Sequence, residues 1–188
     1  NFKLHSKGAV LIEGPKWCGK TTTAEKISAS VLYMDDPQNI EQNIAMAEMN
    51  PKRLLKGDTP RLIDEWQLAP KLWNAIRFEV DHRDKLGQFI LTGSAVPANT
   101  KDVTHSGTGR FTWLMMRPMS LYESGESSGE VSLKELFSKP DKIVGTNDNN
   151  IDDIAFQICR GGWPHAIGMK EKAALSQAED YYDAVVKS

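Results

Sequence analysis

Residues 14–21 read G-x-x-x-x-G-K-T, a spacing of residue types typical of loops that bind the phosphates of a nucleotide. The apolar run 9–12 precedes this motif, and a helix-compatible stretch at 22–29 follows it. A strand that turns through glycines into a helix points successive backbone N–H groups and the positive helix end at one spot. These flanks favour a phosphate site over the alternative, a glycine-rich turn that carries a stray lysine.

The residue types inside the motif suit a magnesium nucleotide. Lys20 can reach the β- and γ-phosphates as a point charge, and the Thr21 hydroxyl can ligate Mg²⁺. Gly14 and Gly19 supply turn geometry that a side chain would block. We therefore expect the nucleotide and its metal ion to contact the loop and the start of the helix: Gly14, Pro15, Lys16, Trp17, Cys18, Gly19, Lys20, Thr21 and Thr22.

Two adjacent carboxylates, Asp64 and Glu65, follow the short apolar run 62–63. On a strand beside the loop, Asp64 would reach Mg²⁺, commonly through water. Glu65 would lie one residue further on, at the sheet edge where ligands of parallel sheets bind and where a water could attack the γ-phosphate. Phosphoryl transfer needs charge neutralisation and an oriented nucleophile. The alternative is a solvated acidic pair at a strand end, and the upstream loop favours the hydrolytic interpretation.

Two positions further along the chain could complete the site. Ser94 ends a strand together with Thr92 and Gly93, and could sense the γ-phosphate or belong to a simple turn. We prefer Ser94 over Thr92 because it projects beyond the strand end. Arg110 follows a polar loop with two glycines, so it could reach the phosphate of a neighbouring subunit or pair with a surface acid.

Local rules leave two other features open. The Gly161–Pro164 stretch could bring Trp163 against the nucleotide, although a helix C-cap followed by a proline stop is the simpler interpretation. Cys18 lies near Lys16 and Lys20 and could be an accessible thiolate. The alternative for Cys18 is a small, buried and inert filler under the loop.

The elements that must position these residues alternate between strands and helices. Strands are expected at 9–12, 31–34, 62–63, 89–92 and 110–115. Helical patterns occur at 40–55, with a break near Pro51, and at 72–80, 133–137, 151–159 and 171–186. Polar stretches at 120–132 and 140–150 indicate exposed loops. The alternation predicts the α/β class, with a parallel sheet covered on both faces.

Composition narrows the range of partners. The chain has 188 residues and a net charge of −2 without a dense Lys/Arg run, so overall charge gives nucleic-acid binding no support. The sequence has no apolar run near the roughly 18 residues of a membrane span. With two cysteines, a reducing cytoplasm is the expected location. The chain begins without Met and reads as a piece of a longer protein.

Together the motifs resemble the AAA+-like ATPases of bacteria and archaea, whose ATPase domain typically precedes a C-terminal domain of unknown function often related to nucleases. The matching segments are 14–21, 62–67, 91–94, 109–111, 118–121 with Glu123, and 161–164. The resemblance implies a P-loop NTPase three-layer sandwich, with sheet order 5-1-4-3-2. An ATPase core at 1–123 would precede a partial helical lid at 124–188, and the C-terminal domain would be absent.

The resemblance also implies ATP and Mg²⁺ as cofactors, Glu65 as catalytic base, a sensor role for Ser94 and nucleotide-side contacts for Gly162 and Pro164. Trp17 and Cys18 depart from the small or polar residues that are usual there, which affects loop packing more than backbone contacts to phosphate. The expected function is a self-associating ATPase switch or motor for the absent domain. A small-molecule kinase is one alternative, and a nucleotide-gated binding module without efficient turnover is another.

Overall fold

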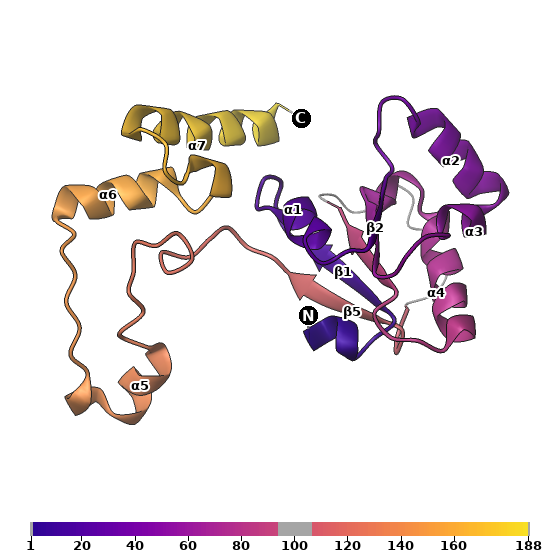
Figure 1. Cartoon of the computed structure of the whole chain (residues 1–188). Coiled ribbons are helices and arrows are strands. Elements are labelled where there is room, and N and C mark those ends of the chain that lie inside the picture. Colours follow the sequence, from indigo (N-terminus) through magenta and orange to yellow (C-terminus); the bar gives the residue numbers. More distant parts are fainter. Residues whose placement is uncertain (1, 94–106, 188) are drawn as a thin grey trace. The chain divides into compact units, whose positions relative to one another are not determined.

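The computed structural model describes residues 2–93 and 107–187, and it divides into two compact units, Asn1–Arg117 and Pro118–Ser188 (Figure 1). Ser94 therefore lies outside the described residues. None of the described helices is long and apolar enough to cross a membrane.

The first unit is built on a five-stranded sheet in the order β2-β3-β4-β1-β5, in which all neighbouring strands are parallel. The strands are β1 (Ala9–Glu13), β2 (Ser30–Tyr33), β3 (Arg61–Asp64), β4 (Phe89–Thr92) and β5 (Phe111–Met115). Read from the other edge, this is the order 5-1-4-3-2. The α/β class, the P-loop NTPase fold and the strand order are thus confirmed.

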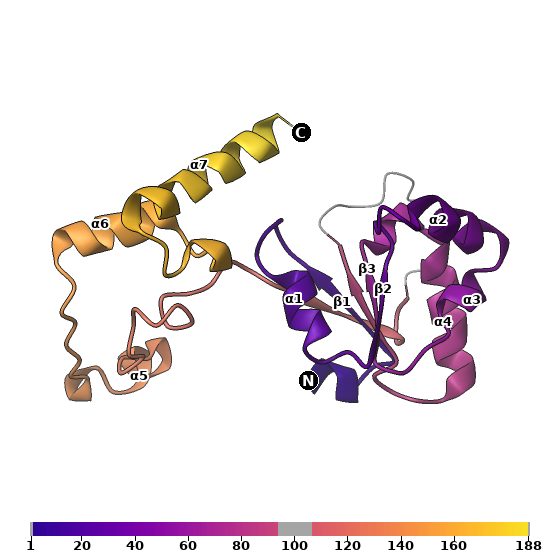
Figure 2. The ribbon, with the colours of Figure 1, turned by 45° about the horizontal axis from the view of Figure 1, so that its top comes forward.

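The three central strands, β1, β3 and β4, are buried on both faces. Successive residues of a strand point to opposite sides of the sheet, so each strand contributes to two clusters. Leu11 and Leu91 belong to one buried cluster, whereas Ile12 and Ile90 belong to another. The first cluster includes residues of α4 (Lys71–Arg83), and the second includes Ala24 of α1 (Lys20–Glu25). Figure 2 shows α1 on one side of the strands and α2 (Ile40–Met49), α3 (Pro51–Leu54) and α4 on the other. The unit is therefore a three-layer sandwich.

Prolines and short turns complete the connections of the first unit. Pro51 occupies the first turn of α3, where its missing N–H costs no helix hydrogen bond, so the helical pattern divides at the expected break. Two 3₁₀ turns, η1 (Phe2–His5) and η2 (Trp66–Leu68), flank β1 and β3 respectively.

The second unit consists of short helices joined by extended segments. Its elements are α5 (Leu133–Ser138), η4 (Pro140–Lys142), α6 (Ile151–Arg160), η5 (Pro164–Ala166) and α7 (Glu171–Val186). The side chain of Asn150 caps α6 by accepting hydrogen bonds from the backbone of Asp152 and Asp153. An ion pair joins the guanidinium of buried Arg160 to the half-buried carboxylate of Glu126, and the pairing lowers the pKa of Glu126.

Candidate nucleotide-binding site

The loop between β1 and α1 has the backbone conformation that its glycines were expected to allow. Gly14 and Gly19 have φ angles of 154° and 92°, and Gly19 occupies the N-cap of α1. A Cβ at Gly14 would lie 2.2 Å from the carbonyl oxygen of Met116. Both the left-handed φ values and this close approach require glycine.

The ammonium group of Lys20 lies within this loop. Its Nζ donates hydrogen bonds to the carbonyl oxygens of Gly14 (3.0 Å) and Pro15 (2.7 Å), and the residue is only 7% exposed. Among the described ion pairs, none joins Lys20 to a carboxylate. The loop therefore holds a buried positive charge that is balanced only by carbonyl dipoles, an environment that suits an anionic ligand.

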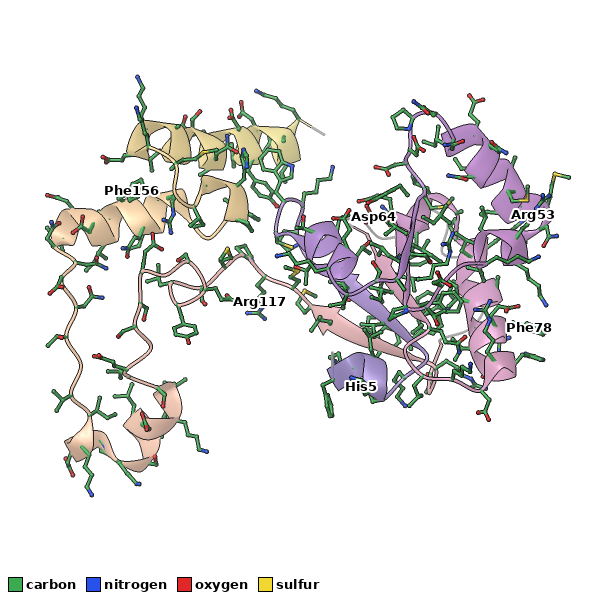
Figure 3. The ribbon with its side chains drawn as sticks, in the orientation of Figure 1. His5, Arg53, Asp64, Phe78, Arg117 and Phe156 are labelled. Carbon is green, nitrogen blue, oxygen red and sulfur yellow. The ribbon has the colours of Figure 1, made fainter. Side chains whose placement is uncertain are left out.

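Thr21 and Asp64 meet although they are far apart in sequence. The Thr21 hydroxyl donates to Asp64 Oδ1 at 2.9 Å, and the Thr92 hydroxyl donates to the same oxygen. The second contact follows from the sheet register, which pairs Asp64 of β3 with Thr92 of β4. Figure 3 shows Asp64 at one end of the sheet and His5 at the opposite end. Asp64 thus lies at the carboxyl edge of the strands, where the loop after β1 also lies.

This pair of oxygen donors fits a magnesium ion. Mg²⁺ prefers hard oxygen ligands and is usually held by one or two protein groups together with phosphate oxygens and waters. A hydroxyl and a carboxylate in direct contact can supply those protein ligands. Within residues 2–93 and 107–187, no three His, Cys, Asp or Glu side chains gather into a metal-binding group. Two protein oxygen ligands suit an ion that also binds phosphate oxygens and waters.

Glu65 leaves β3 in the left-handed conformation, with φ 51° and ψ 43°. This conformation is uncommon for a residue with a side chain and often marks a functional position. Glu65 occupies the N-cap of η2, which is held in place by Trp66, a buried residue whose ring lies 5.2 Å from that of Trp73. Gln67 Nε2 donates a hydrogen bond to Glu65 Oε2, a contact that the sequence pattern did not predict.

Comparison with known proteins agrees with this geometry. Residues 6–125, well over half of the chain, match a family described as an AAA domain. The chain belongs to this family. The first unit is accordingly an AAA-type, nucleotide-binding P-loop module.

Two mycobacterial proteins are similar to this AAA domain. The uncharacterized proteins Rv2008c of Mycobacterium tuberculosis and Mb2031c of Mycobacterium bovis are each 28% identical to it over 129 residues. The alignment covers 68% of this chain, which spans only 29% of the length of each relative. Among solved structures, C. elegans PCH-2 matches with a TM-score of 0.39 and 16% identity, over 95% of this chain and 60% of that one.

Cys18 of the AAA domain is fully buried beneath the phosphate loop, and its Sγ lies 3.9 Å from the carbonyl oxygen of Met116. Trp17, by contrast, is 49% exposed. Of the two interpretations that the sequence left open, the structure therefore favours the packed filler over the accessible thiol.

Arg110 of the AAA domain lies at the edge of the sheet opposite the phosphate loop. It precedes β5, and its carbonyl oxygen accepts a hydrogen bond from Ala9 at the start of β1. Its Nε donates to Asp81 Oδ1 at 2.7 Å, which lowers the pKa of Asp81. The sequence left open two roles for Arg110, a contact with the phosphate of a neighbouring subunit and a pairing with a surface acid. The structure shows the second of these, the surface pairing. Contact with the chain's own loop is excluded, and action on a neighbouring subunit stays a prediction.

Thr92, rather than the expected Ser94, contacts Asp64 directly among the described residues, and it is fully buried. The signal that could have identified it is the adjacency of β3 and β4, because strands that end together bring their last residues side by side. The sensor role of Ser94 stays a prediction.

Gly162 and Pro164 belong to the second unit, where local packing accounts for both residue types. The carbonyl oxygen of Gly162 accepts a hydrogen bond from Met119 N at 2.7 Å, and a Cβ at Gly162 would lie 2.0 Å from Met119 O. Pro164 begins η5, and the ring of Trp163 lies 4.1 Å from that of Tyr181. The expected nucleotide contacts of Gly162 and Pro164 remain predictions.

Proposed function

We propose that this AAA domain binds ATP with Mg²⁺ and hydrolyses it, acting as a switch or motor for a C-terminal domain. The observation that carries the proposal is the Thr21–Asp64 contact, with Lys20 inside the adjacent loop and Glu65 directly after Asp64. Phosphate, metal ion and attacking water would then meet at one edge of the sheet.

Each residue has a distinct part in the proposed reaction. Backbone N–H groups of the loop and the ammonium of Lys20 would bind the β- and γ-phosphates. Thr21 and Asp64 would hold Mg²⁺, which supplies charge neutralisation to the phosphate oxygens when bound. Glu65 would orient a water and accept its proton as the water oxygen attacks the γ-phosphorus, and the bond to the bridging oxygen of ADP breaks.

Glu65 is the reason to propose hydrolysis rather than transfer to a small-molecule acceptor. A carboxylate beside the γ-phosphate can activate water, whereas a kinase needs a site for its acceptor and arginines in its lid. The segment 120–150 contains no arginine. We therefore propose water as the phosphoryl acceptor.

The switch or motor role and self-association are further parts of this proposal. The relatives extend well beyond the matched region, since this chain spans 29% of their length. A nucleotide-dependent module within a longer chain can couple turnover to the other parts of that chain.

Incubation with Mg-ATP, with and without candidate acceptors, tests the proposal by measuring free phosphate and ATP binding together. We expect phosphate release without an acceptor. Phosphate that appears only on an added acceptor would identify a kinase, and binding without phosphate release would identify a nucleotide-gated binding module.

A further inference from the structure

The side chain of Gln67 reaches back to Glu65 across a single turn. Glu65 adopts a left-handed backbone, and Trp66 anchors the following 3₁₀ turn in the core, so residues 65 and 67 face each other. Gln67 Nε2 then donates a hydrogen bond to Glu65 Oε2. An ionised carboxylate can only accept, so this contact requires that the amide nitrogen, and not the amide oxygen, faces Glu65.

This orientation leaves the other end of the amide without a partner among the residues that the structure describes. Gln67 Oε1 is buried and accepts no hydrogen bond from any residue within 2–93 or 107–187. A buried, unpartnered oxygen is unfavourable and calls for a compensating role. Directing the amide N–H at Glu65 is such a role.

Gly93 provides the space that the amide occupies. A Cβ at Gly93 would lie 2.2 Å from Gln67 Oε1 and 3.1 Å from its Cδ. The φ angle of Gly93 lies outside the left-handed region, so its backbone does not itself require glycine. A Cβ at Gly93 would therefore displace the Gln67 amide from its present position.

We propose that Gln67 is a positioning residue for Glu65, and that Gly93 is needed to seat it. This inference rests on the proposed function of Glu65 as the base. With Oε2 bound by Gln67, Oε1 of Glu65 is the oxygen left to accept the proton of the water. The Gln67 amide is a neutral donor, so it orients the carboxylate without adding a charge beside it.

The first test is Gln67→Met, which keeps the length of the side chain and removes the donor. We expect turnover of Mg-ATP to fall about 10- to 100-fold, because a base displaced by a fraction of an ångström loses that much. Mg-ATP affinity should stay within about 2-fold, since Gln67 contacts Glu65 and not the phosphate loop.

Gln88→Met is a matched control. Gln88 is also buried with an unpartnered Oε1 among the described residues, but it precedes β4, at the other end of that strand from Gly93, and its Nε2 donates to Lys85 O. The same substitution there should leave turnover at the wild-type level. Equal losses in both variants would assign the effect to general packing and overturn the proposal.

Gly93→Ala tests whether Gly93 is needed to make room for the Gln67 amide, without a change at Gln67 itself. In the wild-type background its Cβ displaces the amide, so turnover should fall as in Gln67→Met. In a Gln67→Ala background the same change should have no further effect, because the displaced atoms are gone. Additive losses would overturn the role of Gly93.

The proposed function can fail separately from this inference. Wild-type protein that binds Mg-ATP without releasing phosphate would overturn both the proposed hydrolysis and the inference that depends on it. Turnover that Glu65→Gln abolishes and Gln67→Met leaves unchanged would keep the proposed function and overturn only the inference.

Discussion

At the scale of single residues, the orientation of Asp64 depends on two hydroxyl groups. Thr21 and Thr92 donate to the same carboxylate oxygen, from the helix after the loop and from the neighbouring strand. Because Thr92 is fully buried, its hydroxyl has no competing water and holds the carboxylate in one position.

Replacing Thr92 by Val keeps the shape of the side chain and removes its donor. We expect Mg²⁺ to support nucleotide binding several-fold less well, since Asp64 loses one of its two hydroxyl donors. The cost in unfolding free energy should be about 1–3 kcal/mol, the usual range for a buried group that loses its partner. Magnesium titrations at fixed ATP measure the effect. Thr112→Val on β5 is the control, and an equal change in both variants would remove Thr92 from the site.

Lys20→Ala should abolish Mg-ATP binding and leave the fold intact. The ammonium contacts only loop carbonyl oxygens in the structure, so its loss removes the phosphate partner rather than core packing. Titration calorimetry measures the affinity, and circular dichroism checks the fold. Lys26→Ala, an exposed lysine that caps the same helix, should bind normally. Near-native affinity in Lys20→Ala would contradict the P-loop assignment.

At the scale of elements, two glycines allow chain segments to approach each other closely. Gly14 brings the phosphate loop against Met116, and Gly162 brings the segment after α6 against Met119. Each contact is with backbone atoms, which cannot move aside as a flexible side chain can.

Gly162→Ala should disrupt the second unit even without nucleotide. Its Cβ would lie 2.0 Å from Met119 O, so the hydrogen bond from Met119 N to Gly162 O should break. Hydrogen exchange of the peptide that contains Met119 measures this loss of protection. Gly145→Ala is the control, because its φ also lies outside the left-handed region and its Cβ would meet the Val131 side chain, which can move aside, rather than backbone. Unchanged protection together with weaker ATP binding would instead assign Gly162 to the nucleotide.

Most elements of the fold could be predicted, because hydrophobic period and turn residues are local signals. The run at 89–92 and the helix at 171–186 have the predicted bounds, and the break at Pro51 follows from proline chemistry. Other bounds differ by one to four residues, as at Arg61, Arg83 and Glu25, since strand and helix ends depend on tertiary contacts.

The candidate site could be predicted only where its residues are adjacent in sequence. The loop and the Asp64–Glu65 pair are contiguous motifs. The contact of Thr92 with Asp64 depends on the pairing of two strands. The contact of Gln67 with Glu65 depends on an unusual backbone turn. Arg110 lies at the amino end of β5, and a short motif does not show at which end of the sheet a residue will lie.

At the scale of the whole molecule, Arg110 and the phosphate loop lie at opposite edges of the sheet. Only a second copy of the chain could bring this arginine to a bound nucleotide. The bond to Asp81 would have to open for that purpose, and both groups are at the surface.

If Arg110 acts on a neighbouring subunit, specific ATPase activity should rise with protein concentration, and Arg110→Ala should remove that rise without changing nucleotide affinity. Asp81→Asn separates this role from a structural one, because it breaks the same ion pair and leaves the arginine in place. We expect Asp81→Asn to keep the concentration dependence. If the specific activity of the wild-type protein does not change with its concentration, Arg110 has a structural role and does not act on a neighbouring subunit.

In the proposed reaction, Glu65 activates water at a site that binds Mg-ATP independently of it. Mg-ATP affinity and phosphate release, measured together for the wild type and for the nearly isosteric Glu65→Gln, separate these two roles. We predict affinity within about 2-fold of the wild type, and turnover lower by about 10²-fold or more, the range for loss of a general base. Equal rates of phosphate release in the two proteins would contradict the role of Glu65 as the base.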